Sequence, residues 1–319
     1  MQAVASPCPS CGSDTNITSL HPFAFDTRGA PVRISVRICR RCDFAWQFPL
    51  TRTERESAQV FEDSYAAAEE ETYFSPARRQ AVSHLQCGLL RNVAGNAGRL
   101  LDIGAGDGTF IRNAAALGWR CTGIDPAAKN TRFVVDGDGT AELRRLSTSD
   151  FQDDRQFDAI TAMDVIEHVP DPAKFLSDTA RLLSDNGVLI LETGNFQSVD
   201  QIDGGQHWWC YQQDHRWYFS PPALAKLISK QGFKHVYLWL RSPRPPGDAI
   251  GPYAGPSKRQ IAGSLIRNPQ SLRETWQRYR ALVHASKNWS QWAALGIFAV
   301  VARKNAPLPK SDLLELRGT

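Results

Sequence analysis

A glycine-rich turn between a short apolar strand and a helix is the part of this sequence that most directly indicates chemistry. Residues 100–108 read Leu-Leu-Asp-Ile-Gly-Ala-Gly-Asp-Gly, and Gly-Ile-Asp-Pro follows at 123–126. Glycines allow the backbone to approach a ligand closely, and an aspartate that ends the next strand can accept hydrogen bonds from ribose hydroxyls. Dinucleotide-binding proteins have the spacing G-x-G-x-x-G, whereas this turn has G-x-G-x-G. The pattern therefore favours S-adenosylmethionine over NAD as the ligand.

Four of the seven cysteines form two matched Cys-x-x-Cys pairs. The pairs are Cys8 with Cys11 and Cys39 with Cys42. Tight turns bring two thiolates from each pair to one tetrahedral ion, so the spacing predicts a closed, structural zinc site. A redox-active Cys-x-x-Cys pair is the alternative. The other three cysteines are expected to be small buried hydrophobic residues.

The composition is that of a globular protein with one substantial core and a small extra module. The formal net charge of +4, without a basic tract, does not demand a nucleic-acid partner. The longest apolar run, 293–302, is too short to span a membrane and predicts a central strand. The N-terminal residues lack the pattern of a secretory signal. We therefore expect a cytoplasmic, reducing location, where thiols more often bind metal than form disulfides.

Strand and helix patterns alternate from residue 99 onward, which predicts a doubly wound, Rossmann-like α/β sheet of seven strands. The expected strands are Leu100–Ile103, Cys121–Asp125, Ala141–Leu146, Phe157–Met163, Val188–Glu192, His235–Leu240 and Leu295–Val301. Helices are expected after Gly108, Pro126, Asp171 and Pro222. Another helix is expected to begin at Ser75-Pro76 and to end near Gly95.

The patterns divide the chain into four parts. Residues 1–50 are predicted to form a small zinc-ribbon-like β module, because apolar and polar residues alternate along 32–38. Residues 51–98 are predicted to be a helical connector that covers the cofactor. Residues 99–305 form the predicted main domain, with an insertion at 243–293 whose apolar stripe packs in the core or in a homodimer. Residues 306–319 are expected to be a polar, mobile tail.

The chain resembles the class I S-adenosylmethionine-dependent methyltransferases over about residues 75–305. The resemblance rests on four segments in the expected order: 100–110, 123–126, 156–172 and 185–193. It implies that Asp102 faces the ammonium of the methionine moiety and that Asp125 binds the ribose hydroxyls. The other cofactor-binding positions that it implies are Gly104, Ala105, Gly106, Gly108, Pro126, Ser149, Asp150, Phe151, Asp164 and Val165.

A second segment is similar to a motif of one group within these methyltransferases. Residues 214–220 read Asp-His-Arg-Trp-Tyr-Phe-Ser. This segment is similar to a carboxylate-His-x-x-Tyr-Phe-Ser motif of bacterial methyltransferases that act on deoxysugars and related metabolites, among which the sugar C-methyltransferases are the nearest group. Those enzymes also carry an N-terminal zinc module, and they usually have glutamate where this chain has Asp214.

The histidines are the candidate groups for activating the methyl acceptor. His215 is the preferred general base and His168 the second candidate, because an imidazole titrates near neutral pH. Each has a structural alternative, such as capping a loop or fixing its conformation. The residues expected to contact the substrate are Tyr65, Tyr73, His207, Tyr211, Asp214 and Tyr218.

These observations predict methyl transfer to a small-molecule acceptor. The acceptor is expected to be a sugar, a nucleotide-sugar or a natural-product intermediate, methylated on oxygen or carbon. Two alternatives remain open from the sequence. One is an RNA methyltransferase whose zinc module binds nucleic acid, and the other is a non-catalytic scaffold. The mild net charge disfavours the first, and the intact glycine turn disfavours the second.

Overall fold

The structure is a computed structural model of the 319-residue chain, and the statements below concern the residues that it describes. These are 7–25, 33–48, 75–128, 131–133, 135, 137–198, 200–201, 205, 208–212, 214–241, 292, 295–308 and 312–316. The predictions for Tyr65, Tyr73 and His207 lie outside the described residues. So do those for the connector up to residue 74 and for almost all of the insertion at 243–293.

The main sheet contains all seven predicted strands, and in the described part of the chain it has nine strands. Its order is β13-β11-β12-β9-β8-β4-β5-β7-β6. The five strands from β9 to β7 run parallel, whereas β12 and β11 are antiparallel to their neighbours. The bounds are β4 Arg99–Ile103, β5 Arg120–Ile124, β6 Thr131–Phe133, β7 Thr140–Arg144, β8 Phe157–Met163, β9 Leu183–Gly194, β11 His235–Trp239, β12 Ile297–Arg303 and β13 Leu313–Glu315.

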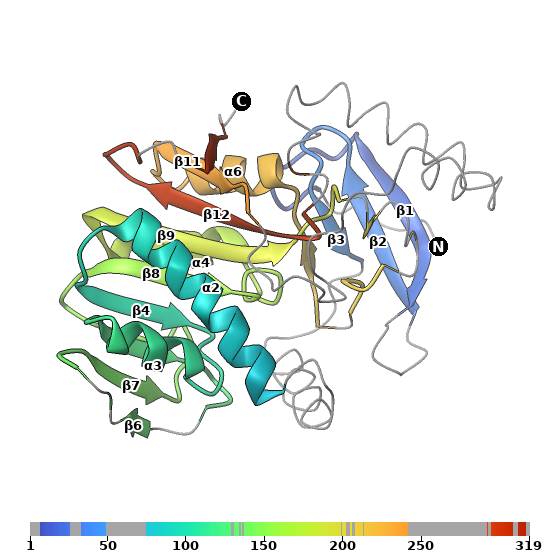
Figure 1. Cartoon of the computed structure of the whole chain (residues 1–319). Coiled ribbons are helices and arrows are strands. Elements are labelled where there is room, and N and C mark those ends of the chain that lie inside the picture. The colour runs from blue at the N-terminus through green and yellow to red at the C-terminus, as the bar shows by residue number, and fades with distance from the viewer. Residues whose placement is uncertain are drawn as a thin grey trace.

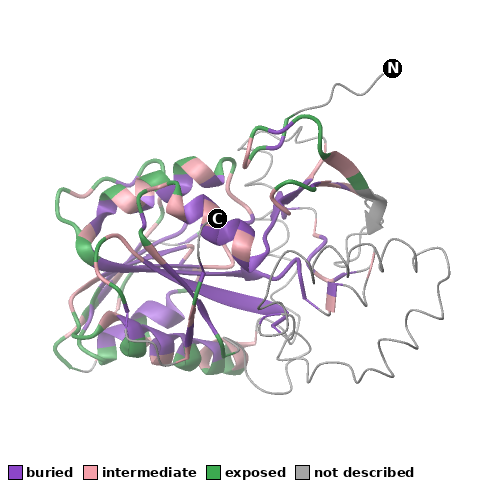
Figure 2. Ribbon diagram, turned by 90° about the horizontal axis from the view of Figure 1, so that it is seen from above, coloured by how far each residue is buried: buried purple, intermediate pink, exposed green. Residues whose placement is uncertain are grey.

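Helices cover both faces of this sheet, as the doubly wound prediction requires (Figure 1). α2 (Pro76–Ala94) and α3 (Thr109–Ala116) lie on one face, and α4 (Pro172–Leu182) and α6 (Pro221–Ser229) on the other. Three of these helices start at a capping side chain followed by proline, which is a strong start signal. The capping residues are Ser75, Asp171 and Ser220. The strands between the two helix layers are almost entirely buried (Figure 2).

The structure corrects two expectations at the ends of elements. No helix follows Pro126, because the Asp125 carboxylate accepts a hydrogen bond from Ala127 N (2.8 Å) and holds a turn, and β6 begins at Thr131. The predicted mobile tail contains β13, which pairs with the free edge of β11. Its apolar residues Leu313 and Leu316 are buried there, which explains why the segment is ordered.

The N-terminal module forms a second sheet that the main domain completes. Its strands are β1 (Ile17–Phe25), β2 (Arg33–Cys39) and β3 (Ala45–Gln47), and β3 pairs with β10 (Trp217–Tyr218) from the main domain. The Phe44 ring lies 5.7 Å from the Trp217 ring and 5.4 Å from the Phe219 ring. In Figure 1 the module lies beside the ends of the parallel strands toward which the arrows point. It therefore shares a core with the residues that follow β9.

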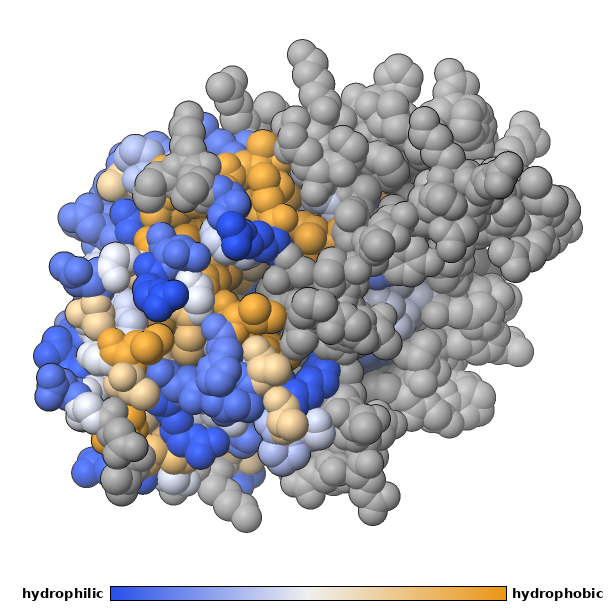
Figure 3. Space-filling view, viewed as in Figure 1, coloured by the Kyte–Doolittle hydropathy of each residue, from blue (hydrophilic) through white to orange (hydrophobic). Residues whose placement is uncertain are grey.

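The surface on the side seen in Figure 3 mixes hydrophilic residues with hydrophobic patches among the coloured atoms. No described helix is both long enough and apolar enough to cross a membrane.

Candidate active site and cysteine centre

The glycine turn joins three neighbouring strand ends. Gly104 N and Ala105 N both donate to Ile124 O, at 2.8 and 3.1 Å, so the turn after β4 is bonded to the end of β5. Gly104 has a φ of 75°, and a Cβ at this position would lie 2.3 Å from Cγ2 of Val165 in the loop after β8. Only glycine fits such a position without strain. The turn therefore brings the loops after β4, β5 and β8 into contact.

Asp125 connects the end of β5 to the same turn. Its Oδ2 accepts a hydrogen bond from Gly106 N at 3.1 Å, and its Oδ1 accepts the bond from Ala127 N. The residue is buried, and burial raises the pKa of its carboxyl. Each carboxylate oxygen has a further lone pair, so the group can still accept bonds from two ribose hydroxyls.

Asp102 is the other carboxylate of this region, and it is also buried. Burial raises its pKa to about 7, and the charge of Asp125 adds to the effect. Oδ1 accepts a hydrogen bond of 2.7 Å from the Thr161 hydroxyl, which opposes the shift. A buried carboxyl of this kind ionises more readily once a cation lies beside it. The sequence analysis did not single out Thr161, whose role depends on its place beside β4 in the sheet.

The remaining cofactor positions differ in exposure. Gly108 has a φ of 80° and is the N-cap of α3, and Pro126 is exposed just after Asp125. Ser149 and Asp150 are exposed, and both side chains bond to the Ser147 hydroxyl. Phe151 is fully buried, with its ring 6.1 Å from that of Phe157. Contact of Phe151 with a cofactor therefore stays a prediction.

The two candidate histidines lie together. The ring centroids of His168 and His215 are 4.7 Å apart, in an edge-to-face arrangement. Asp214 contacts His168: its carbonyl oxygen lies 3.2 Å from Nδ1 of that histidine, and its carboxylate 3.6 Å. A carbonyl oxygen only accepts, so we assign the Nδ1 proton of His168 to this bond.

Glu167 belongs to the same group, although the sequence analysis did not single it out. Its side chain is buried, and Oε2 accepts no hydrogen bond from any described residue. Burial raises its pKa well above the ordinary value, and the charge of Asp164 raises it further. The Glu167 carbonyl accepts bonds from Arg216 N (2.8 Å) and Trp217 N (3.2 Å), which attach the loop after β8 to the segment before β10.

Asp164 and Val165 connect the glycine turn to the histidines. Asp164 has a φ of 55°, an uncommon conformation for a residue with a side chain. Three residues later, His168 N donates to Val165 O at 2.9 Å, which closes the loop after β8 into a tight turn. Val165 thus lies next to Gly104, and His168 follows Val165 at the end of the same tight turn.

Tyr211 and Tyr218, which are expected to contact the substrate, lie in a packed aromatic cluster. Tyr211 and Tyr218 are buried, with ring centroids 5.2 Å apart, and the Trp208 ring also lies 5.2 Å from Tyr211. The Tyr218 hydroxyl accepts a bond from Gln47 Nε2 (3.4 Å), which belongs to β3 of the N-terminal module. Direct contact of these tyrosines with a substrate stays a prediction.

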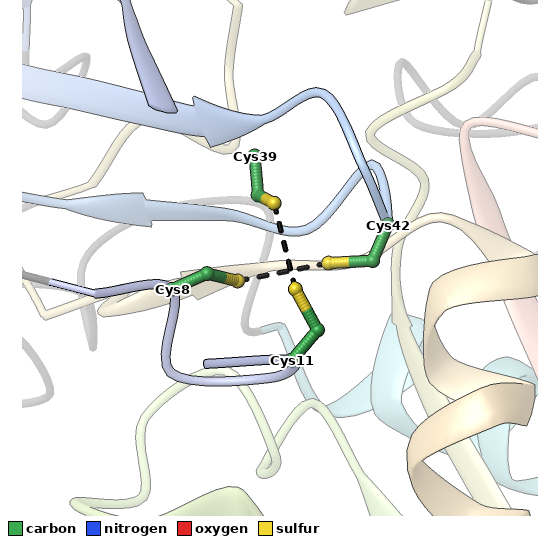
Figure 4. Close-up of side chains that lie close together, drawn as sticks. All are labelled: Cys8, Cys11, Cys39 and Cys42. Carbon is green, nitrogen blue, oxygen red and sulfur yellow. Dashed lines mark hydrogen bonds between the residues drawn. The ribbon is translucent and has the colours of Figure 1, made fainter. Parts of the chain in front are cut away.

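The four paired cysteines converge on one point (Figure 4). Their sulfur atoms all lie within 4.8 Å of one another, and the Cys8–Cys42 and Cys11–Cys39 separations are both 3.6 Å. Zinc held by four thiolates at about 2.3 Å in a tetrahedron separates the sulfurs by about 3.8 Å, so the donor set and its spacing fit this ion. Each pair sits in a tight turn, closed by Gly12 N to Cys8 O (2.8 Å) and by Asp43 N to Cys39 O (2.8 Å).

A family described as "Methyltransferase domain" matches residues 77–238, which is half of the chain. The chain belongs to this methyltransferase family. The match covers α2 to β11, including the glycine turn and the histidine pair, and it confirms the resemblance that the motifs predicted.

Individual relatives are also similar to part of the chain. The ubiquinone biosynthesis O-methyltransferase of Cereibacter sphaeroides is 32% identical over 150 residues, covering 43% of this chain and 61% of the relative. The enzyme of that name from Paramagnetospirillum magneticum is 36% identical over 144 residues, covering 42% and 58%. The chain thus spans about three fifths of the length of these relatives. A solved structure of Burkholderia thailandensis 1,6-didemethyltoxoflavin-N1-methyltransferase is 16% identical, with a TM-score of 0.44 and coverage of 82% and 95%.

Proposed function

We propose that this protein transfers a methyl group from S-adenosylmethionine to a small-molecule acceptor. The observation that carries the proposal is the junction of the glycine turn, Asp125 and the loop after β8, which continues directly into His168. The turn and the two aspartates would hold the cofactor, and the group formed by Glu167, His168 and His215 would lie on the acceptor side. The relatives named O-methyltransferases favour an oxygen acceptor over carbon.

The chemistry is an in-line displacement at the methyl carbon. The acceptor oxygen forms a bond to this carbon while the carbon–sulfur bond breaks, and the bonding electron pair remains on sulfur. The products are the methylated acceptor and S-adenosylhomocysteine, and the acceptor's proton must leave. In this proposal the neighbouring rings of His168 and His215 would align the acceptor and assist that proton transfer.

We further propose that Cys8, Cys11, Cys39 and Cys42 hold one zinc ion with a structural role. Four thiolates leave no open coordination position, so the ion would supply rigidity and not chemistry. The structure also indicates what would be made rigid. β3 of the module pairs with β10, and Gln47 N donates to Arg216 O (2.9 Å) next to His215. The zinc module would therefore support the acceptor side of the site.

Cys39→Ser is expected to abolish the binding of zinc, which should be about one ion per chain in the wild type. Because β3 supports the segment that carries His215, turnover should fall while binding of S-adenosylhomocysteine changes little. Metal analysis and calorimetry measure the two effects. Cys87→Ser is the matched control, since Cys87 is a buried thiol outside the cluster. A wild-type protein that is folded but holds no zinc would contradict the proposal.

Cofactor affinity is expected to rise with pH until Asp102 is ionised. The pKa of Asp102 is about 7 in the free protein, so its carboxyl is largely protonated below that value. The cofactor's ammonium favours the ionised form, so binding releases a proton, and affinity should rise up to about tenfold per pH unit below 7 and then level off. Titrations of S-adenosylhomocysteine between about pH 5.5 and 8 measure this slope. Asp102→Asn should remove it, and a slope that persists in this variant would assign the effect to another group.

A further inference from the structure

A glutamine of the N-terminal module bonds to the segment that carries His215. Gln47 is the last residue of β3, and its Nε2 donates a hydrogen bond to Gln212 O at 2.7 Å, although 165 positions separate the two residues in the chain. His215 N donates to the same carbonyl oxygen at 3.2 Å. A single acceptor therefore joins the side-chain amide of the module to the backbone of the candidate base.

A second hydrogen bond of Gln47 lies on the other side of His215. Gln47 N donates to Arg216 O at 2.9 Å, and Nε2 also donates to the Tyr218 hydroxyl at 3.4 Å. Gln212 precedes His215 in the chain and Arg216 follows it. Gln47 thus bonds to the backbone both before and after this histidine. Hydrogen bonds on both sides restrict where the imidazole can lie, as a functional side chain requires.

β3 is packed firmly enough to act as a support for these bonds. It pairs with β2 on one side and with β10 on the other. Ala45 and Trp46, which precede Gln47, are buried. Cys39 N donates to Phe44 O at 2.9 Å, which attaches the residue before β3 to the second cysteine turn. Gln47 therefore connects a strand that is fixed at both edges to the segment of His215.

We propose that Gln47 is a positioning residue for His215. Its side-chain amide holds the Gln212 carbonyl, and with it the backbone leading to His215, in the conformation that places the His215 ring 4.7 Å from that of His168. The consequence for methyl transfer rests on the proposed function, in which His215 lies on the acceptor side. Displacement of an aligning group lowers turnover steeply, whereas the nucleoside site at the glycine turn stays as it is.

Gln47→Glu tests the proposal with the smallest change of shape. An ionised carboxylate is about as large as the amide, but it donates no hydrogen bond and is repelled by the Gln212 carbonyl oxygen. The backbone bond to Arg216 and the pairing of β3 do not depend on the side chain. We expect kcat to fall by about tenfold or more, with little change in zinc content or in the affinity for S-adenosylhomocysteine.

Nuclear magnetic resonance of the imidazoles gives a readout that a merely structural role of Gln47 would not change. The chain has seven histidines, and with ¹⁵N-labelled rings the His215 signal is the one that disappears in His215→Ala. This signal should shift in Gln47→Glu, whereas that of His235 on β11 should not. Asn16→Ala is the matched control. It removes an exposed amide that bonds to Thr15 within the module, and it should leave turnover and the His215 signal as in the wild type.

The outcomes separate this inference from the proposed function. Gln47→Ala removes the same side-chain bonds without adding a charge, and it replaces Gln47→Glu if circular dichroism shows that the latter has not folded. An unshifted His215 signal in the folded variant would overturn the inference. So would wild-type turnover in that variant when His215→Ala is impaired. A shifted signal together with full turnover in His215→Ala would support the positioning by Gln47 and contradict only the proposed role of His215.

Discussion

His215→Ala is expected to lower methyl-transfer turnover by about 100-fold or more, the usual scale when a group that assists proton transfer is removed. The His215 ring lies 4.7 Å from that of His168, in the group that we place on the acceptor side. Affinity for S-adenosylhomocysteine should change little, because the glycine turn and Asp125 are untouched. Release of S-adenosylhomocysteine with a panel of phenolic, sugar and natural-product acceptors measures the first effect, and calorimetry measures the second.

The control for this experiment is His235→Ala, which removes an imidazole at the start of β11, outside the cluster. Its turnover should equal that of the wild type. If the His215 variant keeps full turnover, this histidine does not activate the acceptor, and His168→Ala becomes the next variant to measure. Full activity in both would leave alignment of the acceptor as the protein's main contribution.

Asp125→Ala is expected to weaken binding of S-adenosylhomocysteine by about 30- to 1,000-fold, equivalent to about 2–4 kcal/mol for hydrogen bonds to a carboxylate. The variant loses the acceptor for the ribose hydroxyls and also the acceptor of the Gly106 N–H bond, which attaches the glycine turn to β5. Calorimetric titration measures the change.

Two further variants serve as comparisons for Asp125→Ala. Asp125→Asn keeps an acceptor oxygen in place, so it should lose less affinity for S-adenosylhomocysteine than Asp125→Ala does. Asp138→Ala removes an exposed aspartate in the turn before β7 and should have no effect. An affinity in Asp125→Ala equal to that of the wild type would mean that the nucleoside binds elsewhere.

The main sheet could be predicted because its signals are local. Most of the parallel strands contain a short apolar run next to turn residues, and Ser75-Pro76 and Asp171-Pro172 mark helix starts by their own side chains. The predictions that were wrong concern segments whose structure depends on contacts that their own sequence does not indicate. Residues Leu313–Glu315 form a strand because β11 offers an edge for pairing, and nothing in residues 306–319 indicates that edge. A helix was predicted after Pro126, but the structure has a turn there, in which Ala127 N donates a hydrogen bond to the Asp125 carboxylate.

The candidate site also contains residues that could be predicted from the sequence and contacts that could not. The glycine turn, Asp125 and the cysteine pairs have fixed spacings, so their residues could be named from the sequence. The contact of Asp214 with His168 could not, because 46 residues separate them in the chain and the bonds from Arg216 N and Trp217 N to Glu167 O bring their segments together only in the fold. Tyr211 and Tyr218 could be named as candidate substrate contacts from the sequence, but their packing against each other depends on the folded chain, and their contact with a substrate stays a prediction.

Calorimetric titration of the wild-type chain with S-adenosylhomocysteine tests the central claim most directly, with NAD as the comparison. The glycine spacing, Asp125 at the end of β5 and the buried Asp102 all belong to the same proposed nucleoside site. The account predicts saturable binding of about one S-adenosylhomocysteine per chain and no binding of NAD. A folded protein that binds NAD instead, or that binds neither compound, would contradict it.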